Sequence, residues 1–385
     1  MKLLLIVCLV SFEMYPQQLV DSFQTSQQHT SYLGSESVNP FTINQIQIPI
    51  NTKTEASLSL ILKSNSGNTM IHKTTLSNKN GGFREIEYDA VIEKEAIYFT
   101  YPFDKKIEAF FEISFSSASG NGQFNPMNWI VQDAFIEKVH EFFGKSDLFK
   151  RKELGFENFT YSSVDEYGNI SNVEPNKVFS VPFLTGVNYY LTFFKNESKI
   201  ISGNASLSFK IPLKSISTEQ SVETGFSINI SKTKKGKHNS SITTTFHSSV
   251  YYHELAKNND YMIGYNNWSY KLAGLLGFNF YNKKNSNVYS FFTTLNKTSS
   301  RLNSNNYSAQ KNNLNQQALK AATKGNEYFE FGTNYAIHFK NKNTLKIELT
   351  IREDLDLNLN SINKILIGRN SEDFGVFIGF QYLIP

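Results

Sequence analysis

The stretch FGVFIGFQYLI, residues 374–384, places an apolar side chain at every second position just before the C-terminal Pro385. Side chains of a strand alternate between two faces, so one face of this stretch is apolar over its whole length. In a soluble sheet such a face would be an aggregation-prone edge, whereas in a closed barrel the strand pairs with the first strand and faces lipid. We therefore predict that residues 374–384 are the closing strand of a transmembrane β-barrel, with an amphipathic strand of a soluble β-protein as the alternative.

The same period of two recurs along the rest of the chain. In residues 205–213, Ser206, Ser208 and Lys210 share one face and apolar residues share the other. Residues 327–339 alternate in the same way, and turn-forming clusters of Asn and Gly separate such segments. Segments of roughly ten residues with this alternation are the signature of outer-membrane barrels. Counting them predicts an all-β, antiparallel barrel of about 12–14 strands.

The composition is compatible with this prediction and excludes two other classes of protein. The chain has 385 residues and a mean hydropathy of −0.35, and beyond its N-terminus it has no apolar run long enough for a membrane-spanning helix. Aromatic residues make up 14% and charged residues only 19%. The net charge is +4 and the basic residues are interspersed with acidic ones, so we expect no nucleic-acid partner.

The N-terminus has the pattern of a secretory signal peptide. Lys2 is followed by the mostly apolar residues 3–12, a run too short to cross a bilayer. We predict a signal peptide over residues 1–18 and a single barrel domain over residues 19–385. The only cysteine, Cys8, lies in the apolar run, so the exported chain would contain no disulfide.

Two segments interrupt the strand pattern. Residues 296–324 are rich in Asn, Ser, Gln and Lys and are predicted to form a long surface loop. Residues 126–145 are predicted to be a helical insertion, because an apolar arc around Phe135 and Val139 repeats at helical spacing.

The polar face of the predicted helix provides the candidate binding residues. Asp133, Glu137 and His140 lie at helical spacing on this face, and Arg151 follows as a charge that could pair with them. Carboxylate and imidazole groups can bind a metal ion or transfer protons. The simpler interpretation is a helix packed by its Phe face against the barrel, and we therefore expect neither a metal nor a cofactor.

The residues around this helix resemble the domain-of-unknown-function 3187 family of bacterial outer-membrane proteins. The resemblance rests on Asn39-Pro40, residues 46–50, Gly120, Gly122, Asp133, Ile136, Glu137, His140, Phe143-Gly144, Arg151, Gly203 and Lys210. The chain departs from the family pattern in the longer spacing over residues 123–132, in Asn204 at a usually acidic position and in the Lys-rich turn around Gly236. The resemblance implies a membrane barrel but no established activity.

The leading functional hypothesis is a porin-like channel or transporter for a small solute or lipid in the bacterial outer membrane. Asp373, Gly375, Ile378 and Phe380 resemble the C-terminal insertion signal of such barrels, although the chain ends on Pro385. The expected partners are outer-membrane lipid, the barrel-insertion machinery and a small solute. A structural or adhesive surface barrel that acts through its extracellular loops remains an alternative.

A lipid-modifying enzyme is the second alternative, although the sequence favours a barrel without catalysis. Its catalytic candidates would be His140, or His247 and His253 with the neighbouring Ser248 and Ser249. The chain contains no phosphate-binding Gly loop and no HExxH or CxxC motif that would indicate another reaction.

Overall fold

The computed structural model describes residues 50–51, 53–78, 83–119, 160–164, 170–172, 177–214, 222–237, 239–254, 267–282, 287–299, 307–309, 327–339, 343–354 and 375–384. These residues form one 15-stranded antiparallel sheet. This part of the chain contains no helix that is long and apolar enough to cross a membrane. The predicted signal peptide and the helical insertion at residues 126–145 lie outside the described residues.

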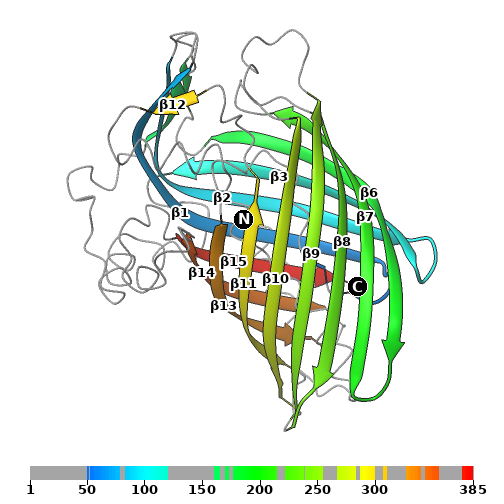
Figure 1. The fold of residues 1–385 in the computed structure, drawn as a ribbon. Coiled ribbons are helices and arrows are strands. Elements are labelled where there is room, and N and C mark those ends of the chain that lie inside the picture. Colours follow the sequence, from blue (N-terminus) through cyan, green and yellow to red (C-terminus); the bar gives the residue numbers. More distant parts are fainter. Residues whose placement is uncertain are drawn as a thin grey trace.

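Twelve of the strands close into a barrel (Figure 1). They follow the chain in order and are β1 (Ser59–Asn78), β2 (Phe83–Pro102), β3 (Ile107–Ser119), β6 (Val178–Lys195), β7 (Lys199–Lys214), β8 (Val222–Lys235), β9 (Ser240–Glu254), β10 (Trp268–Tyr281), β11 (Val288–Thr298), β13 (Glu327–His338), β14 (Thr344–Asp354) and β15 (Gly375–Ile384). β15 pairs with β14 on one side and with β1 on the other, from Leu60–Ile384 to Gly67–Phe377. The predicted fold, strand number and closing strand are therefore confirmed.

Three short strands lie outside the ring. The far end of β1 pairs with β12 (Tyr307–Ala309), and the far end of β2 pairs with β4 (Thr160–Val164), which pairs in turn with β5 (Ile170–Asn172). Figure 1 shows this extension at the upper left, where β1 and β2 continue beyond the barrel. β12 and the last residues of β11 fall within the predicted loop at 296–324, so that prediction was wrong at residues 296–298 and 307–309.

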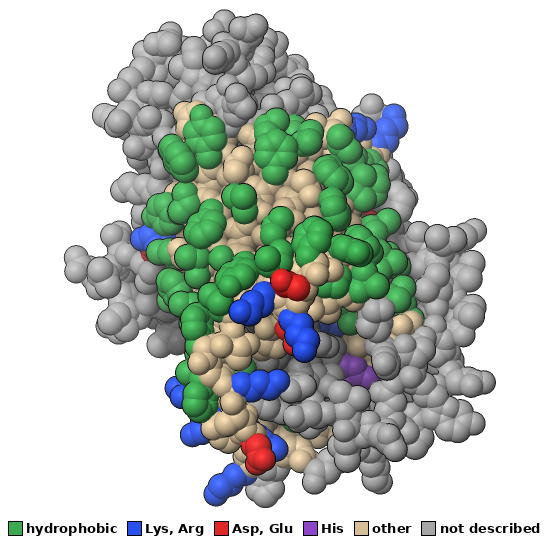
Figure 2. All heavy atoms as spheres, turned by 90° about the vertical axis from the view of Figure 1, so that its right-hand side faces the viewer, with side chains coloured by type: hydrophobic (Ala, Val, Ile, Leu, Met, Phe, Trp, Pro, Cys, Tyr) green, Lys and Arg blue, Asp and Glu red, His purple; other side chains and the backbone are tan. Residues whose placement is uncertain are grey.

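The barrel wall has its polar side chains inside and its large apolar side chains outside. In β7, Leu207 is 58% exposed and Phe209 is 40% exposed. The alternate residues Ser208 and Lys210 are at most 2% exposed. β13 follows the same rule, with Phe331 exposed and Glu330 buried, as its alternation predicted. Figure 2 shows hydrophobic side chains gathered over the wall in a band, with Lys side chains below it. This arrangement, inverted relative to a soluble protein, is typical of a barrel in lipid.

Near the C-terminal end of β15, side chains from outside the strand cover its apolar face. Tyr382 lies in register with Leu62 and Leu345 on the outer face, yet it is only 2% exposed. Its ring packs on Phe339 in the turn after β13, with centroids 6.4 Å apart, and its hydroxyl accepts a hydrogen bond of 2.7 Å from Asn343. Phe339 after β13 and Asn343 before β14 therefore shield this part of the face.

The connections between barrel strands alternate in length. At one end they are short and comprise residues 103–106, 196–198, 236–239, 282–287 and 339–343. β1 begins and β15 finishes at this same end. At the other end most connections are longer and include residues 215–221, 255–267 and 355–374. In outer-membrane barrels, short turns face the periplasm and long loops face the outside.

Inside the barrel, a glycine leaves room for an aromatic ring. Phe292 on β11 lies directly opposite Gly332 on β13, and a Cβ atom at position 332 would lie 2.2 Å from Cζ of Phe292. The Phe292 ring is 5% exposed and is held among other buried residues, so it has little freedom to move away.

We expect Gly332→Val to destabilise the barrel by about 1–3 kcal/mol, because the new side chain overpacks this contact. The matched control is Gly274→Val, since a Cβ atom at Gly274 on β10 would meet no atom within 4 Å. Urea titration of the protein in vesicles, followed by Trp fluorescence, measures both variants. Equal stabilities of the two variants would contradict the packing argument.

Candidate functional site

The inner wall of the barrel is built mainly from small hydroxyl and amide side chains. On β7, β8 and β9 they are each at most 4% exposed and comprise Ser202, Asn204, Ser206, Ser208, Ser227, Asn229, Ser231, Thr233, Ser241, Thr243, Thr245 and Ser249. Some pair across strands, as between the hydroxyl oxygens of Ser231 and Thr245 at 2.9 Å. Such groups both donate and accept hydrogen bonds, so the wall is compatible with water or a polar solute.

A stretch of chain before β1 lies inside the barrel. We call the described residues 50–51 and 53–57 the internal segment. Ile50 is 1% exposed and packs with Ala273 and Leu275 of β10 and Phe292 of β11. The next residue, Asn51, donates a hydrogen bond of 3.1 Å to the hydroxyl of Tyr190 on β6. The internal segment therefore contacts two separate parts of the inner wall.

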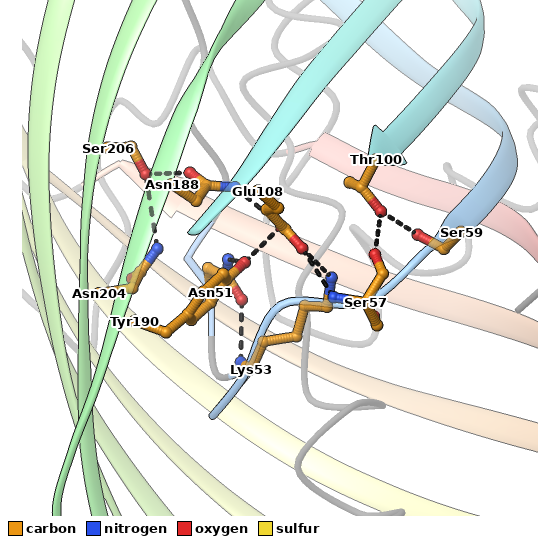
Figure 3. A network of polar contacts seen from close by, with 10 residues as sticks. All are labelled: Asn51, Lys53, Ser57, Ser59, Thr100, Glu108, Asn188, Tyr190, Asn204 and Ser206. Carbon is orange, nitrogen blue, oxygen red and sulfur yellow. Dashed lines mark hydrogen bonds and ion pairs between the residues drawn. The ribbon is translucent and has the colours of Figure 1, made fainter. Parts of the chain in front are cut away.

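Glu108, at the start of β3, holds the internal segment at the short-turn end (Figure 3). Its Oε2 lies 2.9 Å from Nζ of Lys53 and accepts a hydrogen bond of 3.1 Å from the backbone N–H of Ser57. Its Oε1 accepts hydrogen bonds from Nδ2 of Asn188 at 3.0 Å and from the hydroxyl of Tyr190 at 2.5 Å. With four donors, the carboxylate is stabilised although its side chain is only 1% exposed.

The hydrogen-bond network continues from Glu108 along the inner wall in two directions, toward β6 and β7 and toward β2. Oδ1 of Asn188 accepts a hydrogen bond from Ser206, whose Oγ lies 3.4 Å from Nδ2 of Asn204. On the other side, Thr100 donates a hydrogen bond of 2.6 Å to the backbone carbonyl of Ser57. Figure 3 shows these residues reaching one another from strands on both sides of the internal segment. The internal segment is thus fixed by polar contacts along its length.

A second carboxylate lies further along the inner wall of β3. Glu112 accepts a hydrogen bond of 2.8 Å from Lys63 on β1 and lies 3.9 Å from Nζ of Lys94 on β2. The Lys63 ammonium also sits over the Tyr98 ring, 4.4 Å from its centroid. The two lysines offset the negative charge of Glu112 within the wall.

The candidate residues from the sequence and those in the structure do not coincide. Asp133, Glu137, His140 and Arg151 lie outside the described residues, and their proposed binding role stays a prediction. Sequence reasoning missed Glu108, which shares the inner face of β3 with Phe110 and Glu112. A glutamate on the polar face of an alternating strand was a usable signal, but its partners lie far away in sequence.

No protein-family model matches the chain, and no curated protein matches it in sequence. Among solved structures the chain is similar to outer-membrane porins and channels. A KdgM porin is 8% identical over 84% of this chain and 98% of that chain, with a TM-score of 0.33. A NanC porin is 9% identical over 84% and 99%, with a TM-score of 0.37. An outer membrane channel from Pseudomonas putida F1 is 8% identical over 86% and 97%, with a TM-score of 0.39. At these TM-scores the similarity carries no argument about function, and the barrel assignment rests on the strand pairing itself.

Proposed function

We propose that this protein is an outer-membrane channel for small polar solutes, and that the internal segment is its plug. The observation that carries the proposal is the position of the internal segment, which lies inside a barrel whose wall is apolar outside and polar inside. A lipid-facing exterior with a hydroxyl-lined interior suits transport through the barrel. A segment bound to two parts of the inner wall obstructs that path.

The proposal includes a location and an orientation. The exposed apolar band supports lipid as the surrounding partner, and the predicted signal peptide at residues 1–18 supports export to the bacterial outer membrane. Assembly there requires the barrel-insertion machinery. With short turns on the periplasmic side, the Glu108 network and the plug would face the periplasm. Membership of the domain-of-unknown-function 3187 family belongs to the same proposal.

The contacts of the plug suggest that it can be displaced. Asn51, Lys53 and Ser57 bind the wall through hydrogen bonds and one ion pair, which water can replace. Ile50 supplies the apolar contact, and a single buried Ile side chain is worth about 1.5–3 kcal/mol. The wall strands are held by continuous backbone ladders that do not depend on the plug.

We expect Lys53→Glu to open the channel. The new carboxylate would face Glu108 at the position now taken by the ammonium, 2.9 Å away, and like charges there repel. Because Lys53 is 21% exposed, we expect the plug to lose about 1–3 kcal/mol of the free energy that holds it against the wall. This loss is enough to raise the fraction of channels with a displaced plug about tenfold. The measurement is the conductance of the purified full-length protein in planar lipid bilayers, together with swelling of vesicles in a neutral sugar.

Lys195→Glu is the matched control, because Lys195 is an exposed lysine at the same end of the barrel. It makes the same charge change without touching Glu108. If Lys53→Glu and Lys195→Glu conduct equally, the internal segment is not a plug. If no variant conducts ions or admits the sugar although the barrel is folded, the channel itself is rejected.

A further inference from the structure

Three inward-facing side chains on β8, β9 and β10 lie in a row and contact one another through polar atoms. The Nε2 atom of His253 lies 2.7 Å from Oγ of Ser269, and its Nδ1 atom lies 3.2 Å from Oε1 of Glu223. Glu223 is 0%, His253 2% and Ser269 5% exposed. A serine hydroxyl, an imidazole and a carboxylate in this order are the arrangement that activates serine for attack on an acyl group.

The strand register places these groups, so their geometry does not depend on a loop. Glu223 and His253 are direct partners across the β8–β9 ladder. The backbone N–H of His253 donates a hydrogen bond of 2.7 Å to the carbonyl of Asn267, just before β10. All three side chains lie close to the long-loop end, because Glu223 and Ser269 lie near the starts of their strands and His253 near the end of its own. Rigid strands are a suitable support for reacting groups.

Two lysines complete the charge arrangement. Nζ of Lys210 lies 3.1 Å from the same Oε1 atom of Glu223 that faces His253, and this ion pair orients the carboxylate. With its Nδ1 proton directed at this carboxylate, His253 would use Nε2 to accept the Ser269 hydroxyl proton. Lys271 lies on the same inner face as Ser269, two residues further along β10.

A second histidine on the same face of β9 provides an internal comparison. Nε2 of His247 lies 3.2 Å from Oγ of Ser249, but its Nδ1 faces Oδ1 of Asn229 at 2.8 Å instead of a carboxylate. The Ser249 hydroxyl also donates a hydrogen bond of 2.7 Å to Tyr251. An amide carries no charge to stabilise an imidazolium, and the Ser249 hydroxyl is directed at Tyr251, so we expect this pair to react much more slowly than Ser269.

We propose that Ser269, His253 and Glu223 form a hydrolytic site that cleaves carboxylic esters at the long-loop end of the lumen. Oγ of Ser269 attacks the ester carbonyl carbon, and its proton moves to Nε2 of His253. The carbon–oxygen bond to the alcohol breaks, and Nε2 returns the proton to the leaving oxygen. Water then attacks the acyl-Ser269 by the same route and releases the carboxylic acid and the free serine.

The position of Ser269 also limits the substrate. Its low exposure suits a compact acyl group such as acetyl, and it faces the lumen rather than the lipid. The substrate class is therefore a small ester that reaches the barrel interior from the long-loop side. Glu223 acts as a positioning residue because it contacts the imidazole and not the ester.

The test uses the full-length protein refolded in detergent, with a small fluorophosphonate as the probe and p-nitrophenyl acetate as the substrate. We expect mass spectrometry to locate the probe adduct on Ser269 and on no other serine. Ser269→Ala should lose the adduct and the esterase rate, whereas Ser249→Ala should keep both. Glu223→Gln should lower kcat by about 10³–10⁴, the effect of replacing the acid in such triads.

Each outcome decides the proposal. Folding of every variant is checked by its heat-modifiable gel mobility, and Ser269→Cys is a smaller change that should keep an acylatable side chain. An adduct on Ser249 instead of Ser269, or no adduct on folded wild-type protein, overturns the proposal. An esterase rate that survives Ser269→Ala also overturns it. None of these results affects the channel proposal, because conductance does not require a reactive serine.

Discussion

Removal of residues 375–385 is expected to abolish barrel formation. β15 pairs with both β1 and β14, so its loss leaves two strands with unpaired backbone groups facing lipid. Each unpaired N–H or C=O group in hydrocarbon costs several kcal/mol, and the unpaired edges contain many of them. We expect less than about a tenth of the chain to reach the folded state after refolding with lipid vesicles, measured by the heat-modifiable band on a gel.

Removal of residues 307–309 is the control for this truncation. These residues form β12, which among the described strands pairs with the far end of β1 alone, beyond the ring. Their loss should leave the yield of folded barrel unchanged. A folded yield of the truncated chain equal to that of the control would contradict closure through β15.

A charged residue placed in the outward-facing apolar band should have the second largest effect on the folded barrel, by lowering its stability. Ile228, at the centre of β8, is 42% exposed on the face that we assign to lipid. We expect Ile228→Arg to destabilise the folded barrel by about 2–4 kcal/mol, the cost of arginine near the middle of a bilayer. Urea titration of the protein in lipid vesicles measures the change in the free energy of unfolding.

Thr224→Arg is the matched control on the same strand and the same face, nearer the long-loop end. Near the interface, the same substitution should cost only about 0–1 kcal/mol. The difference between the two variants therefore reports depth in the bilayer rather than loss of strand propensity. If the two arginines have equal costs in vesicles, the outward face of β8 does not lie in lipid.

The period-two alternation allowed much of the fold to be predicted. For β7 and β13, the residues expected on each face of the wall lie on those faces, and the number of strands falls within the predicted range. Which face points into the barrel also followed from chemistry, because exposing Ser208 and Lys210 to hydrocarbon would destabilise the folded barrel. The covering of Tyr382 by Phe339 was missed, because it depends on how one short turn folds over the outer wall.

The functional groups were much harder to predict. The sequence drew attention to Asp133, Glu137 and His140 because a helix brings neighbours in sequence onto one face. In contrast, Tyr190 is separated by 82 residues from Glu108, and Lys53 by 55. The Ser269–His253 pair is nearer in sequence, at 16 residues, but its geometry depends on the exact register between β9 and β10.

Residues 374–384, just before Pro385, illustrate which features the sequence determines and which depend on the tertiary structure. By itself the sequence determined that this stretch is a strand with one apolar face and that a barrel needs it for closure, because alternation is a local property of an extended backbone. Only the tertiary structure decided that β15 pairs with β1 at Leu60–Ile384, that the internal segment lies in the lumen, and that Glu223, His253 and Ser269 meet. These features depend on strand register and on contacts across the barrel, which join residues far apart in the chain.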